Sequence, residues 1–442
     1  MKKLLSYITF GSTLFVSLSA CAIPGDLEIT GFLSVVTSWT DASYLTSGVE
    51  PVYVSSIGKR PSFDRDSNVG VQFTKQLRPD LDLTVQLLGR GVAQFDVEAT
   101  WGFLKWEPND NWQFRAGRVR TSPYMLSDYL DVGYAYPWVR PPVEVYSQIP
   151  NSFSNFTGAD VRYKREICKR DLSLTAFYGA NTGHLNFPAI PGTEIFDTIK
   201  LKQRDIGSFS VKFGDEVFSV RAGYETAMVT LFPSAGTIMD GLNSFLNAYA
   251  LTPGFLPGVG FTAPIGADYI NYFSAYNSRF TFMGIGYQFD WNNVVSMAEL
   301  VKRHAATPII ANAIGWYWMG GYRVKQFLPH VTFARERLVD SKGRQFNSVI
   351  NGLFTSPLLP APKSPKTLDE VAQELIYTSQ FYDGGAGAQT SVTVGLRWDI
   401  YQGVAIKAEY QRVHPDNNTP GLFDFNPGKS VNVYSLAIDA VM

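Results

Sequence analysis

Charged side chains stand between apolar neighbours at several points of this sequence. Arg115, Arg162 and Arg221 each have an apolar residue on both sides. Alternate residues of a β-strand face opposite sides of the sheet, so strands with this pattern collect fixed charge on one face. Fixed charges at close quarters select and orient ions and polar solutes. The candidate residues on the charged face are Arg90, Arg115, Arg162, Arg221, Arg323, Arg397 and Lys407, together with Asp96 and Glu98.

One segment, residues 119–156, brings three further carboxylates, Asp128, Asp131 and Glu144. It is long, and its many aromatic side chains supply apolar surface that a solvated linker lacks. Its prolines stiffen the backbone and keep it from joining a sheet for long. We therefore expect the segment to fold into a barrel of strands, where its carboxylates face arginines of the wall across a narrowed gap.

The sequence offers no catalytic or metal-binding pattern. Its histidines are scattered through loops and strand ends, outside any recognisable serine or cysteine motif. The GxG at 284–286 lies in a strand pattern, without the following helix that a nucleotide-binding turn needs. We therefore expect no enzyme activity, no metal site and no cofactor.

Short alternating segments fill most of the remaining chain. Segments of about ten residues, joined in turn by short and long connections, are typical of a transmembrane β-barrel. We count sixteen, an even number as closure of a single-chain antiparallel barrel requires, with a loop expected from 179 to about 204. The predicted strands are 27–39, 68–74, 81–90, 96–103, 112–118, 157–166, 172–178, 208–213, 218–225, 278–289, 294–303, 313–325, 330–339, 390–400, 404–413 and 430–442.

The first residues predict export. Lys2 and Lys3 precede an apolar run over 4–18 and then small residues, which is typical of a secretory signal peptide. Cleavage after Ala22 gives a leader of 1–22 and a single barrel domain of 23–442. A lipobox reading, with Cys21 as an acylated first residue, is the alternative. Cys168 is the only other cysteine, so no intrachain disulfide is expected after cleavage.

The composition fits a chain that crosses a membrane as strands. Charged residues make up 17% and aromatic residues 14%, the balance expected of a barrel with a lipid-facing apolar band and aromatic girdles. The net charge of -1 argues against nucleic acid as a partner.

Two long connections are predicted to contain short helices. Helical spacing after capping residues places these helices near 240–250 and 367–379.

Arg335 and Arg337 share the parity of apolar residues on their strand. A charge on the lipid face near mid-membrane costs about 2–4 kcal/mol, so we expect both arginines to face another subunit, a loop or lipid headgroups.

Over essentially all of 23–442 the chain resembles the trimeric porins of Gram-negative outer membranes. The resemblance rests on the leader, the alternation of short turns and long connections, and the oversized third long connection directly after the fifth strand. The motif 127–146 is similar to a less-studied porin branch, and the alternating last strand is similar to the family's assembly signal, although it ends in Met442 instead of Phe.

The resemblance implies an all-β fold, a 16-stranded antiparallel transmembrane β-barrel with an inward-folded third extracellular loop. It also implies a homotrimer surrounded by outer-membrane lipid. The family's eyelet would place Asp128, Asp131 and Glu144 opposite Arg90, Arg115 and Arg162. The function implied is passive diffusion of small hydrophilic solutes and ions through a water-filled channel.

Two other functions are also compatible with the sequence. The many inward arginines would also suit a channel specific for anions such as phosphate or sulfate. The long connections and low charge would also suit a non-conducting barrel that displays surface loops for adhesion.

Overall fold

A computed structural model provides the three-dimensional structure of the protein. It describes residues 27–442, apart from 46–47, 49, 55, 122, 150–154, 187–197, 233–275, 307–311, 340–387, 417–419 and 424–425. The predicted leader and the predicted helices near 240–250 and 367–379 lie outside the described residues.

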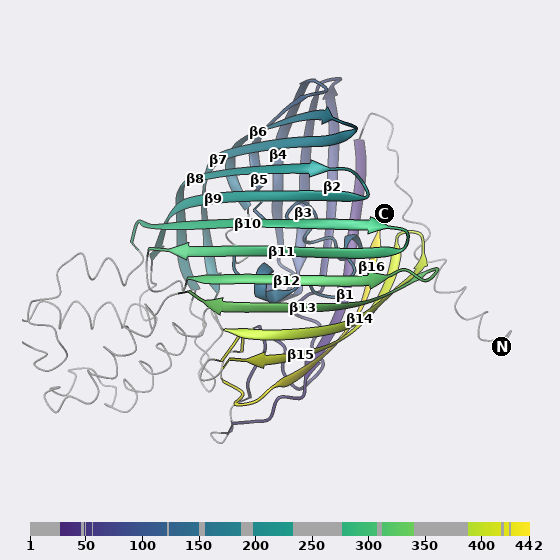
Figure 1. Ribbon diagram of the computed structural model, residues 1–442. Helices are drawn as coiled ribbons and strands as arrows, with labels where there is room; N and C mark the ends of the chain where they lie inside the picture. The colour runs from purple at the N-terminus through teal and green to yellow at the C-terminus, as the bar shows by residue number, and fades with distance from the viewer. Residues whose placement is uncertain are drawn as a thin grey trace, which may run out of the picture.

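Sixteen antiparallel strands form a closed barrel, which confirms the predicted fold class (Figure 1). Each strand pairs with its neighbours in sequence, and β1 pairs with β16 to close the ring. The strands are β1 (Leu27–Thr40), β2 (Asn68–Arg78), β3 (Leu81–Arg90), β4 (Val97–Asn109), β5 (Trp112–Arg120), β6 (Asn155–Ile167), β7 (Arg170–Asn186), β8 (Thr198–Gly214), β9 (Phe218–Phe232), β10 (Ser278–Trp291), β11 (Val294–Ala305), β12 (Ala313–Tyr322), β13 (Phe327–Leu338), β14 (Gln389–Tyr401), β15 (Val404–Pro415) and β16 (Val431–Val441).

The predicted loop from 179 to about 204 is wrong at both ends. β7 continues to Asn186 and β8 begins at Thr198. The pairing shifts register between Gly179 and Asn181 and again between Arg204 and Gly207. Such irregularities interrupt the strict alternation on which strand prediction depends, so the outer parts of both strands are not recognisable from their pattern.

Tight turns join the strands at one end of the barrel. The β10–β11 turn places Asn292 and Asn293 at positive φ, and the β6–β7 turn does the same with Cys168 and Lys169. Two consecutive positive φ values match the twist of a two-residue hairpin. The long connections therefore all leave from the opposite end, and the third of them follows β5. This end is called the loop end below, and the other is called the turn end.

The two faces of the wall differ in character. Outward side chains are apolar and exposed, as for Met283 and Ile285 on β10. Inward side chains around much of the ring are polar, but on β10 and β12 they include the buried Phe282, Tyr317 and Met319. Both faces of this part of the wall are therefore apolar, because the connection between β5 and β6 covers these inward residues.

Among the described residues, no helix is both long and apolar enough to cross a bilayer.

Candidate functional site

The segment between β5 and β6 contacts strands all round the ring. The Met125 amide donates to Glu299 Oε1 on β11 at 2.9 Å, and Trp138 Nε1 donates to Thr332 Oγ1 on β13 at 2.8 Å. Further contacts reach β1, β3, β9, β14 and β15. A segment that touches so many strands of a closed ring runs through its interior. We call residues 121–149 the inner segment.

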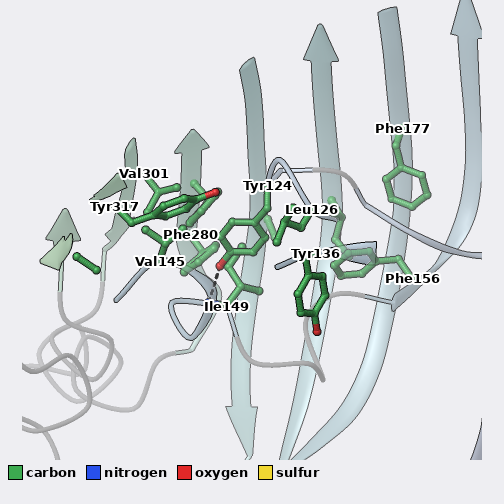
Figure 2. Packing of buried hydrophobic residues seen from close by; sticks show 14 of the residues in the cluster. Tyr124, Leu126, Tyr136, Val145, Ile149, Phe156, Phe177, Phe280, Val301 and Tyr317 are labelled. Atoms are coloured by element: carbon green, nitrogen blue, oxygen red, sulfur yellow. Dashed lines mark hydrogen bonds between the residues drawn. The ribbon is translucent and has the colours of Figure 1, made fainter. Parts of the chain in front are cut away.

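An apolar core fixes one side of the inner segment to β10–β12 (Figure 2). The Tyr124 ring packs edge-on to Phe282 with centroids 4.8 Å apart, and Trp138 packs edge-on to Tyr317 at 5.4 Å. The Tyr124 hydroxyl also accepts a hydrogen bond from the Ile149 amide at 3.0 Å, which ties the two ends of the segment together. Buried aromatic pairs of this kind stabilise beyond their area, so this half of the bore is filled by protein.

Two cations, the buried Lys407 of β15 and the partly buried Arg397 of β14, hold the middle of the inner segment. Lys407 Nζ donates to the Gly133 and Trp138 carbonyls at 2.6 and 2.8 Å and forms an ion pair with Asp439 at 2.8 Å. Arg397 Nη1 donates to the Tyr134 and Tyr136 carbonyls at 2.6 and 3.0 Å. Both side chains are inward, as predicted, but they hold the backbone of the segment and do not stand free in the bore.

Asp131 connects the inner segment to two arginines. Arg90 Nη2 lies 3.2 Å from its Oδ2, and Arg120 Nη2 lies 2.5 Å from the same oxygen. Burial by itself would raise the pKa of Asp131, but the charges of Arg120 and Arg90 outweigh it and hold that pKa below its ordinary value. Arg90 also pairs with Glu98. Asp131 is therefore ionised and fixed at this edge of the segment.

The free edge of the inner segment faces three arginines of β5, β6 and β9. Asp128 is half exposed and pairs with Arg221 at 3.1 Å, while Arg115 pairs with Asp160 at 2.7 Å. Within the described part of the chain, the Arg162 side chain has no hydrogen bond or ion pair. Its charged neighbours are Asp128, Arg115, Asp160 and Arg221. One uncompensated guanidinium therefore lies among paired charges.

Three predicted residues lie away from this cluster. Glu144, in the short helix α2 (Val143–Tyr146), is fully buried and accepts a hydrogen bond from Gln389 Nε2 on β14 at 2.7 Å. Burial raises the pKa of its carboxyl. Asp96 is exposed in the link before β4, and Arg323 pairs with Asp290 at the turn end. Glu144 therefore does not face Arg90, Arg115 or Arg162 across a gap, because apolar packing turns α2 towards β12–β14.

Three important residues were absent from the predicted set. The sequence pattern ends the fifth strand at residue 118 and leaves Arg120 in the loop, whereas β5 ends at Arg120. Glu299 accepts from the Met125 amide and from the Tyr146 hydroxyl, and Arg303 Nη1 donates to the Gln148 carbonyl at 2.8 Å. The alternation of β11 does place Glu299 and Arg303 on one face, but only the path of the inner segment gives them partners.

Among the described residues, no group of three or more histidine, cysteine, aspartate or glutamate side chains could hold a metal ion.

Comparison with known proteins gives a fold and no sequence relative. No family model matches the chain, and no curated protein matches it. The structure is similar to that of Salmonella typhi OmpF in complex with daunomycin, with 12% identity, a TM-score of 0.51, and 94% of this chain and 97% of that chain covered. It is also similar to an anion-selective porin from Comamonas acidovorans, with 8% identity, a TM-score of 0.51, and 94% and 99% covered. The chain therefore has the 16-stranded barrel fold of the porins.

Proposed function

We propose that the protein is an outer-membrane porin, through which small hydrophilic solutes and ions diffuse passively. The observation that carries the proposal is the asymmetric inner segment. Apolar packing and buried ionic contacts hold one side of it against β10–β16, while its other edge presents Asp128 towards Arg221 and Arg162. A rigid constriction with fixed charge on both sides is what a selective but ungated pore requires.

The charges of the constriction favour a weak preference for anions. Among the described residues of the constriction, five arginines, including Arg120, meet four carboxylates, and Arg162 is the arginine without an ion pair. An unpaired guanidinium can exchange its water for a passing carboxylate or phosphate. The similar barrel from Comamonas acidovorans is itself described as anion-selective.

The outer surface supports a homotrimer. The outward residues of β16 and β1–β4 are mostly apolar and include Val35, Leu87, Leu436 and Ile438, all exposed in a single chain. Such a surface suits either lipid or another subunit. We place the mature chain, from about residue 23, in the outer membrane of a Gram-negative bacterium. A heat-dependent shift in electrophoretic mobility of the purified protein would test the trimer.

Conductance in a planar bilayer tests the function. We expect an ohmic current, with a reversal potential under a salt gradient that favours anions. Arg162→Ala should raise the conductance and shift the reversal potential towards cation preference, because it removes the unpaired charge. Arg165→Ala, on the same strand but exposed near the turn end, should change neither.

The other outcomes of this measurement decide between the alternatives. A barrel that carries no current would refute the proposed porin function and support a role in displaying the surface connections. A current that phosphate or sulfate alone blocks would replace the general pore with a specific anion channel. An unchanged reversal potential in Arg162→Ala would remove Arg162 from the constriction.

A further inference from the structure

The outer wall carries a band of basic side chains near the loop end of β8–β15. They are exposed and lie in the loop-end halves of their strands. Elsewhere on the outward face, the side chains in the middle of these strands are mostly apolar. The band consists of Lys200, Lys202, Arg204, Arg279, Lys302, Arg335, Arg337 and Arg412.

The orientation of the band follows from its neighbours in sequence. Arg303 bonds to the inner segment, so Lys302, the preceding residue, faces outward. Glu336 is buried in the interior, so Arg335 and Arg337 on either side of it also face outward. The basic residues therefore share the face of the exposed Trp316 and Phe333.

The strand register brings the central residues of the band together. Ile314 of β12 is the partner of both Lys302 and Arg337, so the two cations lie on one line across three strands, about 10 Å apart. Trp316, two residues further along β12, is the partner of Leu300 and Arg335. A tryptophan thus lies directly beside the cations on the membrane side.

The height of this row matches the edge of a bilayer. Tyr322, an exposed aromatic residue at the turn end, follows Ile314 by eight residues on β12. Eight residues of a strand tilted at about 40° rise roughly 20 Å, close to the apolar band of about 25 Å on such barrels. The basic row therefore lies at the level of the headgroups when the aromatic residue at the turn end lies at the opposite interface.

The band is little neutralised and is confined to one part of the wall. Among the described residues, Lys302 and Arg337 form no ion pair, and Arg335 pairs only with the part-exposed Asp416 at 3.4 Å. The outward residues of β16 and β1–β4 in the loop-end half include no lysine or arginine. Basic charge is therefore concentrated away from the apolar outer surface of β16 and β1–β4.

We propose that the band around Lys302, Arg335 and Arg337 binds the phosphate groups of phosphorylated lipids in the leaflet that surrounds the loop end. This inference rests on the proposed function only in placing the barrel in an outer membrane. Lysine and arginine form charge-assisted hydrogen bonds to phosphate oxygens, and arginine can do so through two nitrogens. Trp316 lies where interfacial tryptophans contact the junction of headgroup and acyl chain.

Lipid binding to the purified oligomer tests the proposal. The detergent-solubilised protein is titrated with diphosphoryl lipid A, and bound lipids are counted by native mass spectrometry. Loss of two cations from a lipid surface weakens binding roughly 30-fold, which is the effect expected of Lys302→Gln/Arg337→Gln. The matched control, Arg165→Gln/Lys169→Gln, removes two exposed cations at the turn end and should bind as the unmodified protein does.

Several results would overturn the proposal. The first is equal affinity of the two double variants for lipid A. The second is binding of phosphatidylcholine as tight as that of lipid A. The third is displacement of the lipid by millimolar inorganic phosphate, which would indicate a site for free phosphate. Bilayer conductance of Lys302→Gln/Arg337→Gln should be unchanged, because both residues face outward. A barrel that binds the lipid without conducting would refute the proposed function alone, and one that conducts without binding would refute this inference alone.

Discussion

Lys407 offers the sharpest test of how the inner segment is held. Its ammonium is almost fully buried, reaches the Gly133 and Trp138 carbonyls, and pairs with Asp439, whose side chain is only 3% exposed. Lys407→Met keeps an unbranched side chain that is one heavy atom shorter and removes the charge. The substitution leaves a carboxylate and two carbonyls without their partner in a site that water reaches poorly.

The expected magnitude follows from that burial. Removing one partner of a buried ion pair typically costs about 3–5 kcal/mol, because the remaining charge is uncompensated. Lys407→Met should therefore lower the free energy of unfolding by about that amount. Lys407→Met/Asp439→Asn also removes the stranded charge, so its loss should fall to about 1–3 kcal/mol for the carbonyls that stay unpaired.

Urea unfolding of the barrel in lipid vesicles, followed by tryptophan fluorescence, measures these differences. Lys105→Met is the matched control, since Lys105 pairs with Asp82 and Glu107 at 2.9 Å but is 27% exposed, and such pairs contribute about 1 kcal/mol or less. Single channels of Lys407→Met should also show noisier current, because the backbone over 133–138 loses its anchor. A loss below about 1 kcal/mol, or a double variant no more stable than the single one, would refute this reasoning.

Two further predictions concern contacts of α2. A Cβ at Gly315 would lie 2.1 Å from the Glu144 carbonyl, whereas one at Gly102 would meet nothing within 4 Å. Gly315→Ala should therefore lower the free energy of unfolding in urea by about 1–3 kcal/mol, and an equal effect of Gly102→Ala would contradict this. Burial raises the pKa of Glu144 in the folded protein above 4.5, the pKa of this carboxyl in the unfolded chain. The free energy of unfolding should therefore fall as the pH rises from 4.5 through the pKa of the folded state. Glu144→Gln should flatten that fall and raise the urea midpoint at neutral pH, and an unchanged pH profile would show that Glu144 is not the group responsible.

Local alternation was sufficient to predict the barrel because each strand must separate two environments. On β9, the outward position of Tyr224 against the inward Arg221 and Glu225 required only a period of two. Alternation does not mark the strand where the pairing shifts register, at Gly179–Asn181 and Arg204–Gly207. It also failed where both faces are apolar, because a buried inward Phe282 or Tyr317 has the same composition as a lipid-facing residue.

The cluster of charges was predictable in kind and only partly in membership. Arg90, Arg115, Arg162 and Arg221 are inward because their strands alternate, and Asp128 and Asp131 reach them because the inner segment is long and stiff. Glu144 lies on the same segment but faces the opposite wall. No spacing in the sequence distinguishes it from Asp131, because the direction of each carboxylate depends on how the segment turns.

Local periodicity and turn residues were enough to predict the number of strands, their antiparallel closure and the long insertion after the fifth strand. The three-dimensional packing was needed to tell which inward charges pair, which hold the inner segment and which, as with Arg162, have no ion pair among the described residues. Ionic and apolar contacts between residues hundreds of positions apart depend on the closed ring, and no local pattern records them.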